Sequence, residues 1–306
     1  MHISVLLNEC IQNLNLKDDS IIVDATLGYG GHSSEILKRI PKGFLYAFDQ
    51  DFEAIKNSNE RLSKIGTNYE IIYSNFVNMK TELEKRNVKH IDGILFDLGV
   101  SSPQLDEGER GFSFHSNAKL DMRMDKRNKL SAYEVVNEYS YDKLVNIFFK
   151  YGEEKYAKNI AKKIIEKRKE KSIETTLELV EIISMAVPAK YKRDHHPARK
   201  VFQAIRIEVN DELNVLAKSL NYALDLIDIN GRICVITFHS LEDKICKEIF
   251  KENSTVKKEL ASLPIIPDEF KPKFKLVDII EPTKDEVQSN NRSRSAKLRI
   301  IERIGR

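Results

Sequence analysis

Three glycines follow an apolar segment that contains an acid: IIVDATL (21–27) leads into Gly28, Gly30 and Gly31. Glycine lets the backbone approach a ligand closely and adopt positive φ angles. In an open α/β sheet, ligands bind beyond the carboxyl ends of the strands, near a turn of this kind. The turn therefore indicates a cofactor site. The glycines alone fit NAD, FAD or S-adenosylmethionine, and also a tight turn without a ligand.

Two carboxylates narrow this choice. The spacing is D-x-T-x-G-x-G-G rather than G-x-G-x-x-G, so that Asp24 lies inside the apolar run. A carboxylate there suits an amino or sulfonium cation and repels a pyrophosphate. Asp49 follows the next apolar run, 18 residues after Gly31, where an acid binds ribose hydroxyls. The chain has no G-x-x-x-x-G-K-[ST] motif, and we therefore favour S-adenosylmethionine.

A third acid, Asp97, follows a later apolar run in FDLGVSSPQ (96–104) and would face the same crevice. A base amine is a poor nucleophile because its lone pair is delocalised into the ring. Hydrogen-bond acceptors aimed at its N–H groups help it to attack a methyl group and then to lose a proton. Asp97 is therefore a candidate catalytic residue. The alternative is that Asp97 or Ser101 is only a cap or turn residue.

His239, in ITFHSLED (236–243), is a second catalytic candidate, for proton handling or substrate contact. The structural alternative is that Ser240 caps a helix with Asp243 in its first turn. No metal site is expected at the neighbouring pair His195 and His196. Adjacent histidines on a helix cannot both point at one ion, and no partner ligands stand at metal spacing.

Basic residues gather in two segments, although the net charge is only +3. Residues 186–206 hold six Lys or Arg against one acid, and residues 292–306 also hold six against one. Such segments predict a polyanion site, and the alternative is two solvated faces. The predicted contacts are Lys190, Lys192, Arg193, His196, Arg199, Lys200, Arg206, Arg292 and Arg294.

Short apolar runs and helical patterns must position these residues. Strands are predicted at 21–27, 43–51, 69–76, 91–100, 231–240, 275–283 and 296–304. Helical patterns between the first strands indicate βαβ units and a parallel sheet. Helical periodicity without strands runs from about 131 to 186. We therefore predict an α/β fold in which residues 1–104 and 206–306 form one domain and 105–205 form a helical insertion.

The composition excludes several classes of protein. No run of about 18 apolar residues occurs among the 306, so no membrane span is expected. The first residues, MHISVLLNEC, lack the basic lead of a signal peptide. Cys10, Cys234 and Cys246 form no C-x-x-C pair and no metal signature. Reduced thiols in a cytoplasmic protein are the expectation.

Several stretches then match one family in order along the chain, from residue 2 to about 304. They include DATLGYGGHS, DLGVSSPQLD, RGFSF, LDMRMD, PARKVFQAIRIEVNDEL and NRSRSAKLR. The chain resembles the bacterial RsmH (MraW) family of S-adenosylmethionine-dependent methyltransferases. The resemblance implies a class I, Rossmann-like methyltransferase domain with a helical substrate-recognition insertion. It also implies methylation of the exocyclic N4 of one cytosine in 16S rRNA, near the decoding centre of the small (30S) subunit.

The resemblance also implies roles for individual residues. The cofactor contacts that it carries over are Gly30, Gly31, His32, Asp49, Phe76, Asp97 and Gln104. Phe76 would line the adenine pocket and Asp49 would bind the ribose hydroxyls, whereas the basic segments would hold RNA phosphates. The chain departs from the family pattern at Ala25, where glycine is frequent, and at Lys200, where threonine is frequent. Asp97 acquires two roles, as a cofactor contact and as the substrate acceptor argued above.

Other functions remain open at this point. An NAD-dependent oxidoreductase and a non-catalytic RNA-binding or assembly protein are two alternatives, although the glycine turn, Asp49 and SSPQ disfavour the second. A third alternative, closer to the favoured function, is a methyltransferase that acts on DNA or on another RNA. The D/N-P-P-Y motif usual for amino methylation of DNA bases is absent, which disfavours DNA. Both a monomer and a homodimer are compatible with the sequence.

Overall fold

The computed structural model describes residues 4–100, 108–194, 196–256, 260 and 266–305. The chain divides into two compact units, one formed by Met1–Gly99 with Leu213–Arg306 and the other by Val100–Glu212. The boundaries fall five residues before and seven residues after the 105–205 segment expected from the sequence. The second boundary lies later than predicted because the helix Arg199–Asn210 packs its apolar residues into the core of the second unit.

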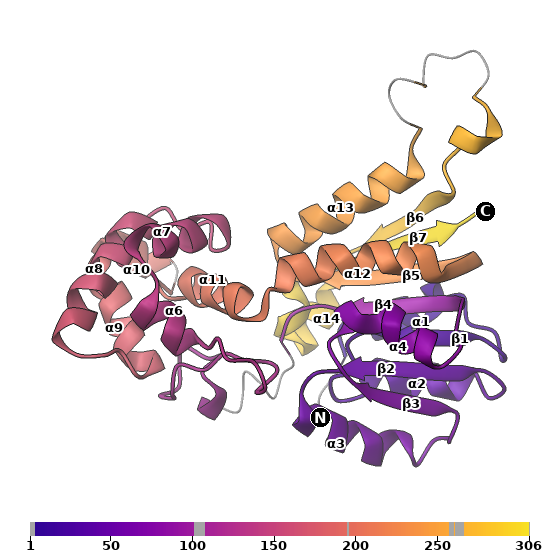
Figure 1. Cartoon of the computed structure of the whole chain (residues 1–306), viewed down its shortest axis with the longest axis horizontal. Helices are drawn as coiled ribbons and strands as arrows, with labels where there is room; N and C mark the ends of the chain where they lie inside the picture. The colour runs from indigo at the N-terminus through magenta and orange to yellow at the C-terminus, as the bar shows by residue number, and fades with distance from the viewer. Residues whose placement is uncertain (1–3, 101–107, 195, 257–259, 261–265, 306) are drawn as a thin grey trace. The chain divides into compact units, whose positions relative to one another are not determined.

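The first unit contains a seven-stranded sheet of order β3-β2-β1-β4-β5-β7-β6 (Figure 1). The strands are β1 (Ile21–Asp24), β2 (Phe44–Asp49), β3 (Tyr69–Tyr73), β4 (Ile91–Asp97), β5 (Ile227–Thr237), β6 (Phe274–Ile280) and β7 (Lys297–Arg303). The pairs among β1 to β5 are parallel, and β7 runs antiparallel to both β5 and β6. All seven predicted strands are confirmed, and the parallel order brings the ends of β1, β2 and β4 to one edge.

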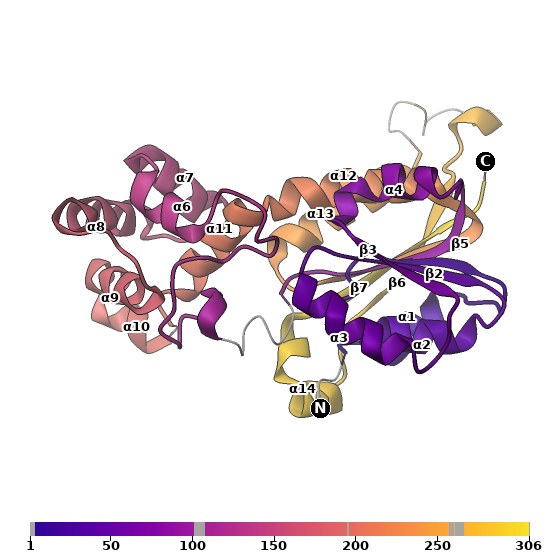
Figure 2. The same cartoon turned by 60° about the horizontal axis from the view of Figure 1, so that its bottom comes forward.

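Helices cover both faces of this sheet (Figure 2). On one face lie α1 (Leu7–Asn13), α2 (Gly31–Arg39) and α3 (Phe52–Leu62), and on the other lie α4 (Met79–Lys85), α12 (Glu212–Leu226) and α13 (Ser240–Ser254). Each face has its own apolar core, and the central strands contribute to both. Fully buried strands explain why IIVDATL and GILFDL are nearly continuous apolar runs rather than alternating ones. The short helix α14 (Lys284–Ser289) follows β6.

The second unit is helical in its described part, with one apolar core of its own. Its helices are α6 (Ala132–Glu138), α7 (Tyr141–Lys150), α8 (Ala157–Glu170), α9 (Thr176–Ala186), α10 (Ala189–Asp194) and α11 (Arg199–Asn210). Capping boxes start α6 at Ser131 and α9 at Thr175, so the sequence itself fixes these starts. In the charge-rich loop LDMRMDKRNK, Arg123 pairs with Asp121 and Arg127 pairs with Asp125. None of the helices in the described residues is long and apolar enough to span a membrane.

The short basic helix α10 contacts the rest of the second unit through Tyr191, whose ring packs against Tyr156 and the apolar core. The Tyr191 hydroxyl donates a 2.7 Å hydrogen bond to Oε2 of Glu154, whose side chain is fully buried. Because Tyr191→Phe leaves a buried charged acceptor with one donor fewer, we expect the free energy of unfolding to fall by about 1–3 kcal/mol. Urea denaturation measures this change. Tyr141→Phe, at an exposed position, is the control, and an equal effect in both variants would contradict the role of this contact.

Candidate cofactor and substrate site

The glycine turn joins the end of β1 to the start of α2. Gly28 and Gly30 have φ angles of 50° and 71°, in the left-handed region that glycine adopts without strain. The Ser58 hydroxyl, on α3, donates a 2.6 Å hydrogen bond to the Gly28 carbonyl and braces the turn from outside. A Cβ atom at Gly31 would lie 1.9 Å from Ser4 Oγ, so this position also requires glycine unless Ser4 moves. Ser58 and Ser4 therefore support the backbone of the turn from the protein side.

Asp24 supports the turn from inside the strand. Its side chain is buried, and it accepts hydrogen bonds from the Ser33 hydroxyl at 2.6 Å and from the Thr26 amide at 3.1 Å. Burial raises its pKa, whereas these two donors act in the opposite direction. The sequence alone suggested direct contact with a cationic ligand. The hydrogen bonds instead show that Asp24 stabilises the glycine turn and the start of α2. Its negative charge also raises the pKa of Asp97.

Asp49, at the end of β2, is half-buried and links the second strand to the turn. Its Oδ2 accepts a 2.8 Å hydrogen bond from the Gly28 amide, and its Oδ1 accepts one of 2.8 Å from the Asp51 amide. Burial raises the pKa of Asp49 to about 7, against the lowering effect of both amides. A carboxylate has about four acceptor sites, so two amides leave capacity for further donors such as hydroxyls.

Phe76 begins the short helix η1 (Phe76–Asn78) after β3. Its partly buried ring packs edge-on against Phe96 of β4, with centroids 5.6 Å apart. Asn75 caps η1 and also donates a 2.9 Å hydrogen bond to Gln50, directly after Asp49. The segment SNF is thus tied to the same edge of the sheet. Gln104 lies outside the described residues, as do Ser101 and His195.

Asp97 ends β4, where its amide donates a 2.6 Å hydrogen bond to Thr26 Oγ1. Its carboxylate is partly exposed, and Oδ2 lies 3.6 Å from Nδ1 of the buried His32 on α2. Burial, the charge of Asp24 and the charge of Glu242 together raise the pKa of Asp97 to about 8. The structure therefore brings His32 and Asp97 together, 65 positions apart in the chain. No motif or spacing in the sequence predicts that these two side chains lie together.

His239 follows β5, where the sequence placed it, and its side chain makes the contacts of a helix cap. It is the N-cap residue of α13: Nδ1 accepts from the Glu242 amide at 3.4 Å, and Nε2 lies 3.1 Å from Glu242 Oε1. The alternative prediction that Ser240 caps this helix is wrong, because the cap is one residue earlier. The amides of Phe238 and His239 in turn donate hydrogen bonds to Glu242 Oε2, and the bond from His239 completes a capping box. These contacts give His239 a structural role and lend no support to a catalytic one.

The first basic segment divides into exposed cations and bonded ones. Within the described part of the chain, the exposed side chains of Lys190, Lys192, Arg193 and Arg199 have no ion-pair or hydrogen-bond partner. Lys200 donates a 2.8 Å hydrogen bond to the Glu153 carbonyl. Arg206 forms a bidentate pair with Glu212, with both N–O distances 2.8 Å. A side chain already held in this way is a weaker phosphate contact than the four exposed ones.

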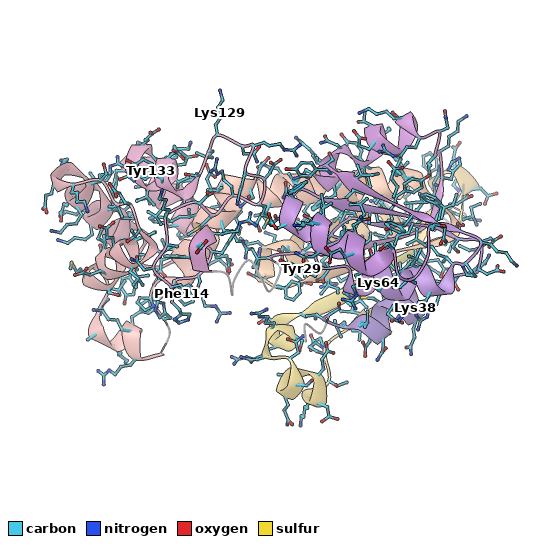
Figure 3. The ribbon with its side chains drawn as sticks, turned by 90° about the horizontal axis from the view of Figure 1, so that it is seen from below. Tyr29, Lys38, Lys64, Phe114, Lys129 and Tyr133 are labelled. Carbon is cyan, nitrogen blue, oxygen red and sulfur yellow. The ribbon has the colours of Figure 1, made fainter. Side chains whose placement is uncertain are left out.

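His196 lies beside these cations and stacks on an aromatic ring. Phe114, labelled in Figure 3, follows the short helix η2 (Gly108–Arg110), and its ring centroid is 4.4 Å from that of His196. His115 lies 5.3 Å from His196, and burial together with this second imidazole lowers the pKa of His196. His196 is therefore neutral near pH 7 and offers a hydrogen bond or a stacking face rather than a fixed positive charge.

In the second basic segment, Arg292 and Arg294 are exposed on the short helix η4 (Asn291–Ser295). Two other cations of this segment stabilise the fold. Arg299 is buried in a bidentate pair with Asp243, and Arg303 donates a 2.6 Å hydrogen bond to the Ile227 carbonyl. The expected interval 292–299 thus contains both surface and buried cations, because Arg292 and Arg294 lie on η4 whereas Arg299 lies within the buried strand β7.

This architecture defines a class of protein. A Rossmann-like sheet with an antiparallel β7 between β5 and β6, a glycine turn after β1 and acids after β2 and β4 is the fold of class I methyltransferases. The chain belongs to the MraW methylase family, whose sequence model matches residues 1–304. A curated relative, "Ribosomal RNA small subunit methyltransferase H" of Exiguobacterium sibiricum, is 56% identical over 99% of this chain and 98% of its own.

The solved structures found in the comparison are more distant in sequence. An rRNA methylase from Streptococcus thermophilus is 13% identical, covers 99% of both chains and gives a TM-score of 0.45. A SAM-dependent O-methyltransferase from Thermotoga maritima is 9% identical, with 98% of this chain and 65% of that one covered, and gives a TM-score of 0.41.

Proposed function

We propose that this protein transfers a methyl group from S-adenosylmethionine to the exocyclic N4 of a cytosine in small-subunit ribosomal RNA. Membership of a methylase family and 56% identity to a small-subunit rRNA methyltransferase support the reaction and the substrate class. The observation that carries the proposal is the edge of the sheet where the glycine turn, Asp49 and Asp97 meet. The same proposal includes three further points. The target cytosine lies near the decoding centre, the substrate is the assembled 30S subunit, and the protein acts in the cytoplasm.

The residues at this edge fit S-adenosylmethionine. Asp49 has acceptor capacity for ribose hydroxyls beside the turn, and the partly buried Phe76 ring offers an apolar face for adenine. Gly30 and Gly31 lie in the turn that precedes α2, and we propose that the methionine part binds beside their backbone. Acids with raised pKa values are groups whose charged form a cation stabilises. When bound, S-adenosylmethionine supplies a methyl group that is already activated on a positive sulfur.

Asp97 is the proposed proton acceptor of the reaction. The cytosine N4 forms a bond to the methyl carbon as the bond from that carbon to sulfur breaks, and Asp97 then takes one N4 proton. Cysteine nucleophiles play no part in this proposal, because Cys10, Cys234 and Cys246 are all buried and burial raises the pKa of each thiol. Holding the amine in line with the methyl group accounts for most of the rate enhancement in such a direct transfer.

The exposed cations of the second unit are proposed to hold the RNA. A cytosine must leave its stack to present N4 to an enzyme, so a single-stranded or locally opened segment is the expected substrate. Lys190, Lys192, Arg193 and Arg199 would contact phosphates, and His196 would add a hydrogen bond or a stacking face. Arg292 and Arg294 remain proposed contacts from the other unit.

Methyl transfer is tested with radiolabelled S-adenosylmethionine and small-subunit rRNA, followed by digestion to nucleosides and mass spectrometry. The expected product is one N4-methylcytidine per rRNA molecule. Ribosomal RNA from cells that lack the gene should lose the same modification. Transfer to another atom, or to DNA instead, would overturn the proposed substrate. An NAD-dependent reaction would show no transfer at all.

Arg199→Gln is expected to weaken RNA binding and to lower the dependence of log K on log salt concentration by about 0.7–0.9. The exposed guanidinium has no partner in the described chain, so its loss removes a phosphate contact without disturbing the fold. Fluorescence anisotropy over a series of salt concentrations measures the slope. Lys158→Gln, on the exposed face of α8, is the matched control and should leave the slope unchanged. An unchanged slope in Arg199→Gln would remove this residue from the interface.

A further inference from the structure

Phe114, His115 and His196 form an aromatic cluster in the second unit. The rings of Phe114 and His196 stack with centroids 4.4 Å apart and 23° between their planes. His115 lies 4.4 Å from Phe114 and 5.3 Å from His196, so each ring contacts the other two. The cluster joins the end of RGFSF (110–114) to the start of PARKVFQA (197–204), and the RNA contacts proposed above include only His196.

The core of the second unit fixes the inner side of the aromatic cluster. Phe202 of α11 is 3% exposed and packs edge-on against Phe114, with ring centroids 5.7 Å apart. Phe114 is partly buried against the same core. His196 is also partly buried, whereas His115 is exposed. The rings are therefore held in place from inside, and the outermost imidazole is in contact with water.

A role in folding accounts for Phe114 but not for His115. Phe114 and Phe202 pack at the apolar core, and an exposed ring does not extend that core. Among the residues that the structure describes, the His115 side chain has no hydrogen-bond or ion-pair partner. Its ring surface is therefore available to a ligand. Because the neighbouring rings already restrict its motion, stacking on a ligand costs less conformational entropy than ordering an isolated side chain.

Exposed cations lie close to the aromatic cluster along the chain. The Arg199 amide donates a 3.2 Å hydrogen bond to the His196 carbonyl, which places this exposed cation beside the cluster at the start of α11. Lys192 and Arg193 precede His196 on α10, and both are exposed. Flat rings next to cations fit single-stranded nucleic acid, whose bases stack on rings while its phosphates contact cations. An acidic protein segment would use the cations and leave the exposed ring without a role.

We propose that the aromatic cluster is a stacking platform for one unpaired base of the RNA substrate, distinct from the cytosine that is methylated, an inference that rests on the proposed function. His115 and His196 contact the base, and Phe114 is a positioning residue that holds both imidazoles. The base is unpaired and unstacked from one neighbour, because one of its faces must be free to meet the rings. Every base has such a face, so the platform sets the register of the strand rather than reading its sequence.

His115→Ala tests the platform in RNA binding by the full chain. The probe is a single-stranded oligoribonucleotide that carries the methylated cytosine and its neighbours in the rRNA. Fluorescence anisotropy at about pH 8, where an ordinary imidazole is neutral, should show a dissociation constant raised about 5- to 150-fold, the contribution of one stacked base. The slope of log K against log salt concentration should stay unchanged, because no phosphate contact is lost. The same ratio of dissociation constants is expected with isolated small ribosomal subunits.

Two further variants distinguish the loss of a stacking ring from other effects. His115→Tyr retains a flat ring and should bind the probe about as tightly as the wild type. Phe149→Ala removes a ring that is 69% exposed on α7 of the same unit, and it should leave the affinity unchanged. Urea denaturation should give all three variants nearly the wild-type free energy of unfolding, because both positions are exposed.

Abasic probes identify the base that stacks. Each nucleotide near the target cytosine is replaced in turn by one without a base, and every probe is bound by the wild-type protein and by His115→Ala. At one position the missing base should weaken binding by the wild type and cause no further loss in His115→Ala. The two changes are not additive at that position, because they remove the same contact.

The outcomes for the platform and for the proposed function are distinct. An affinity of His115→Ala within about threefold of the wild type, below the contribution of one stacked base, would overturn the platform. Additive losses at every abasic position, a lower salt slope in His115→Ala, or a loss that His115→Tyr does not restore would overturn it as well. A wild-type protein that binds neither the probe nor isolated small subunits would overturn the proposed function itself.

Discussion

Asp97→Asn is expected to lower the rate constant of methyl transfer by a factor of about 10²–10⁴, the usual contribution of a positioned general base. Asparagine keeps the shape of the side chain but cannot accept a proton from the cytosine amine. The amide of residue 97 still donates to Thr26 Oγ1, so the end of β4 should keep its position. Single-turnover transfer of a labelled methyl group to small-subunit rRNA measures the chemical step.

Asp92→Asn is the matched control for this variant. Asp92 lies at the other end of the same strand, is exposed, and accepts a hydrogen bond from the Ile21 amide. Its replacement tests the effect of removing one carboxylate from β4 without touching the proposed site. A rate for Asp97→Asn within about tenfold of the wild type would mean that the proton leaves to solvent rather than to this carboxylate.

The strands and the glycine turn could be predicted because their signals are local. Buried parallel strands are nearly continuous apolar runs, and Gly28 and Gly30 occupy φ angles that other residues avoid. Strand ends were less accurate: the run predicted at 69–76 contains β3 only as far as Tyr73, because Asn75 turns the chain by capping η1. A polar residue at the end of an apolar run signals a boundary but does not fix its position.

The contacts that define the chemistry could not be predicted, because they join residues far apart in the chain. The His32–Asp97 pair and the bond from the Asp97 amide to Thr26 depend on the sheet order, which places β4 beside β1. Ion pairs also separate the basic residues into bonded and exposed ones, and this separation cannot be predicted by counting charges. Arg206 and Arg299 are held by bidentate carboxylates, whereas Arg199 is exposed. Charge per segment predicts a basic region but not which of its cations remain available.

Asp49→Ala is the second variant for which a large effect is expected, with the dissociation constant of S-adenosylmethionine rising by at least about 100-fold. A hydrogen bond to a charged acceptor contributes about 1.5–3 kcal/mol, and two ribose hydroxyls would supply two such bonds. The variant also removes the acceptor for the Gly28 amide. The pKa of Asp49 is about 7 in the folded protein, so the wild-type affinity should fall as the pH is lowered through 7 and the carboxylate is protonated.

The direct contribution of the hydroxyls is separable from the support that Asp49 gives to the turn. An analogue of S-adenosylhomocysteine without the ribose hydroxyls should bind the wild-type protein much more weakly than S-adenosylhomocysteine itself. In Asp49→Ala the two ligands should bind almost equally, because their difference is measured on the same altered turn and only the missing carboxylate distinguishes them. A difference as large as that in the wild type would mean that other groups hold the hydroxyls. Asp49 would then act only through the Gly28 amide, as a brace for the glycine turn.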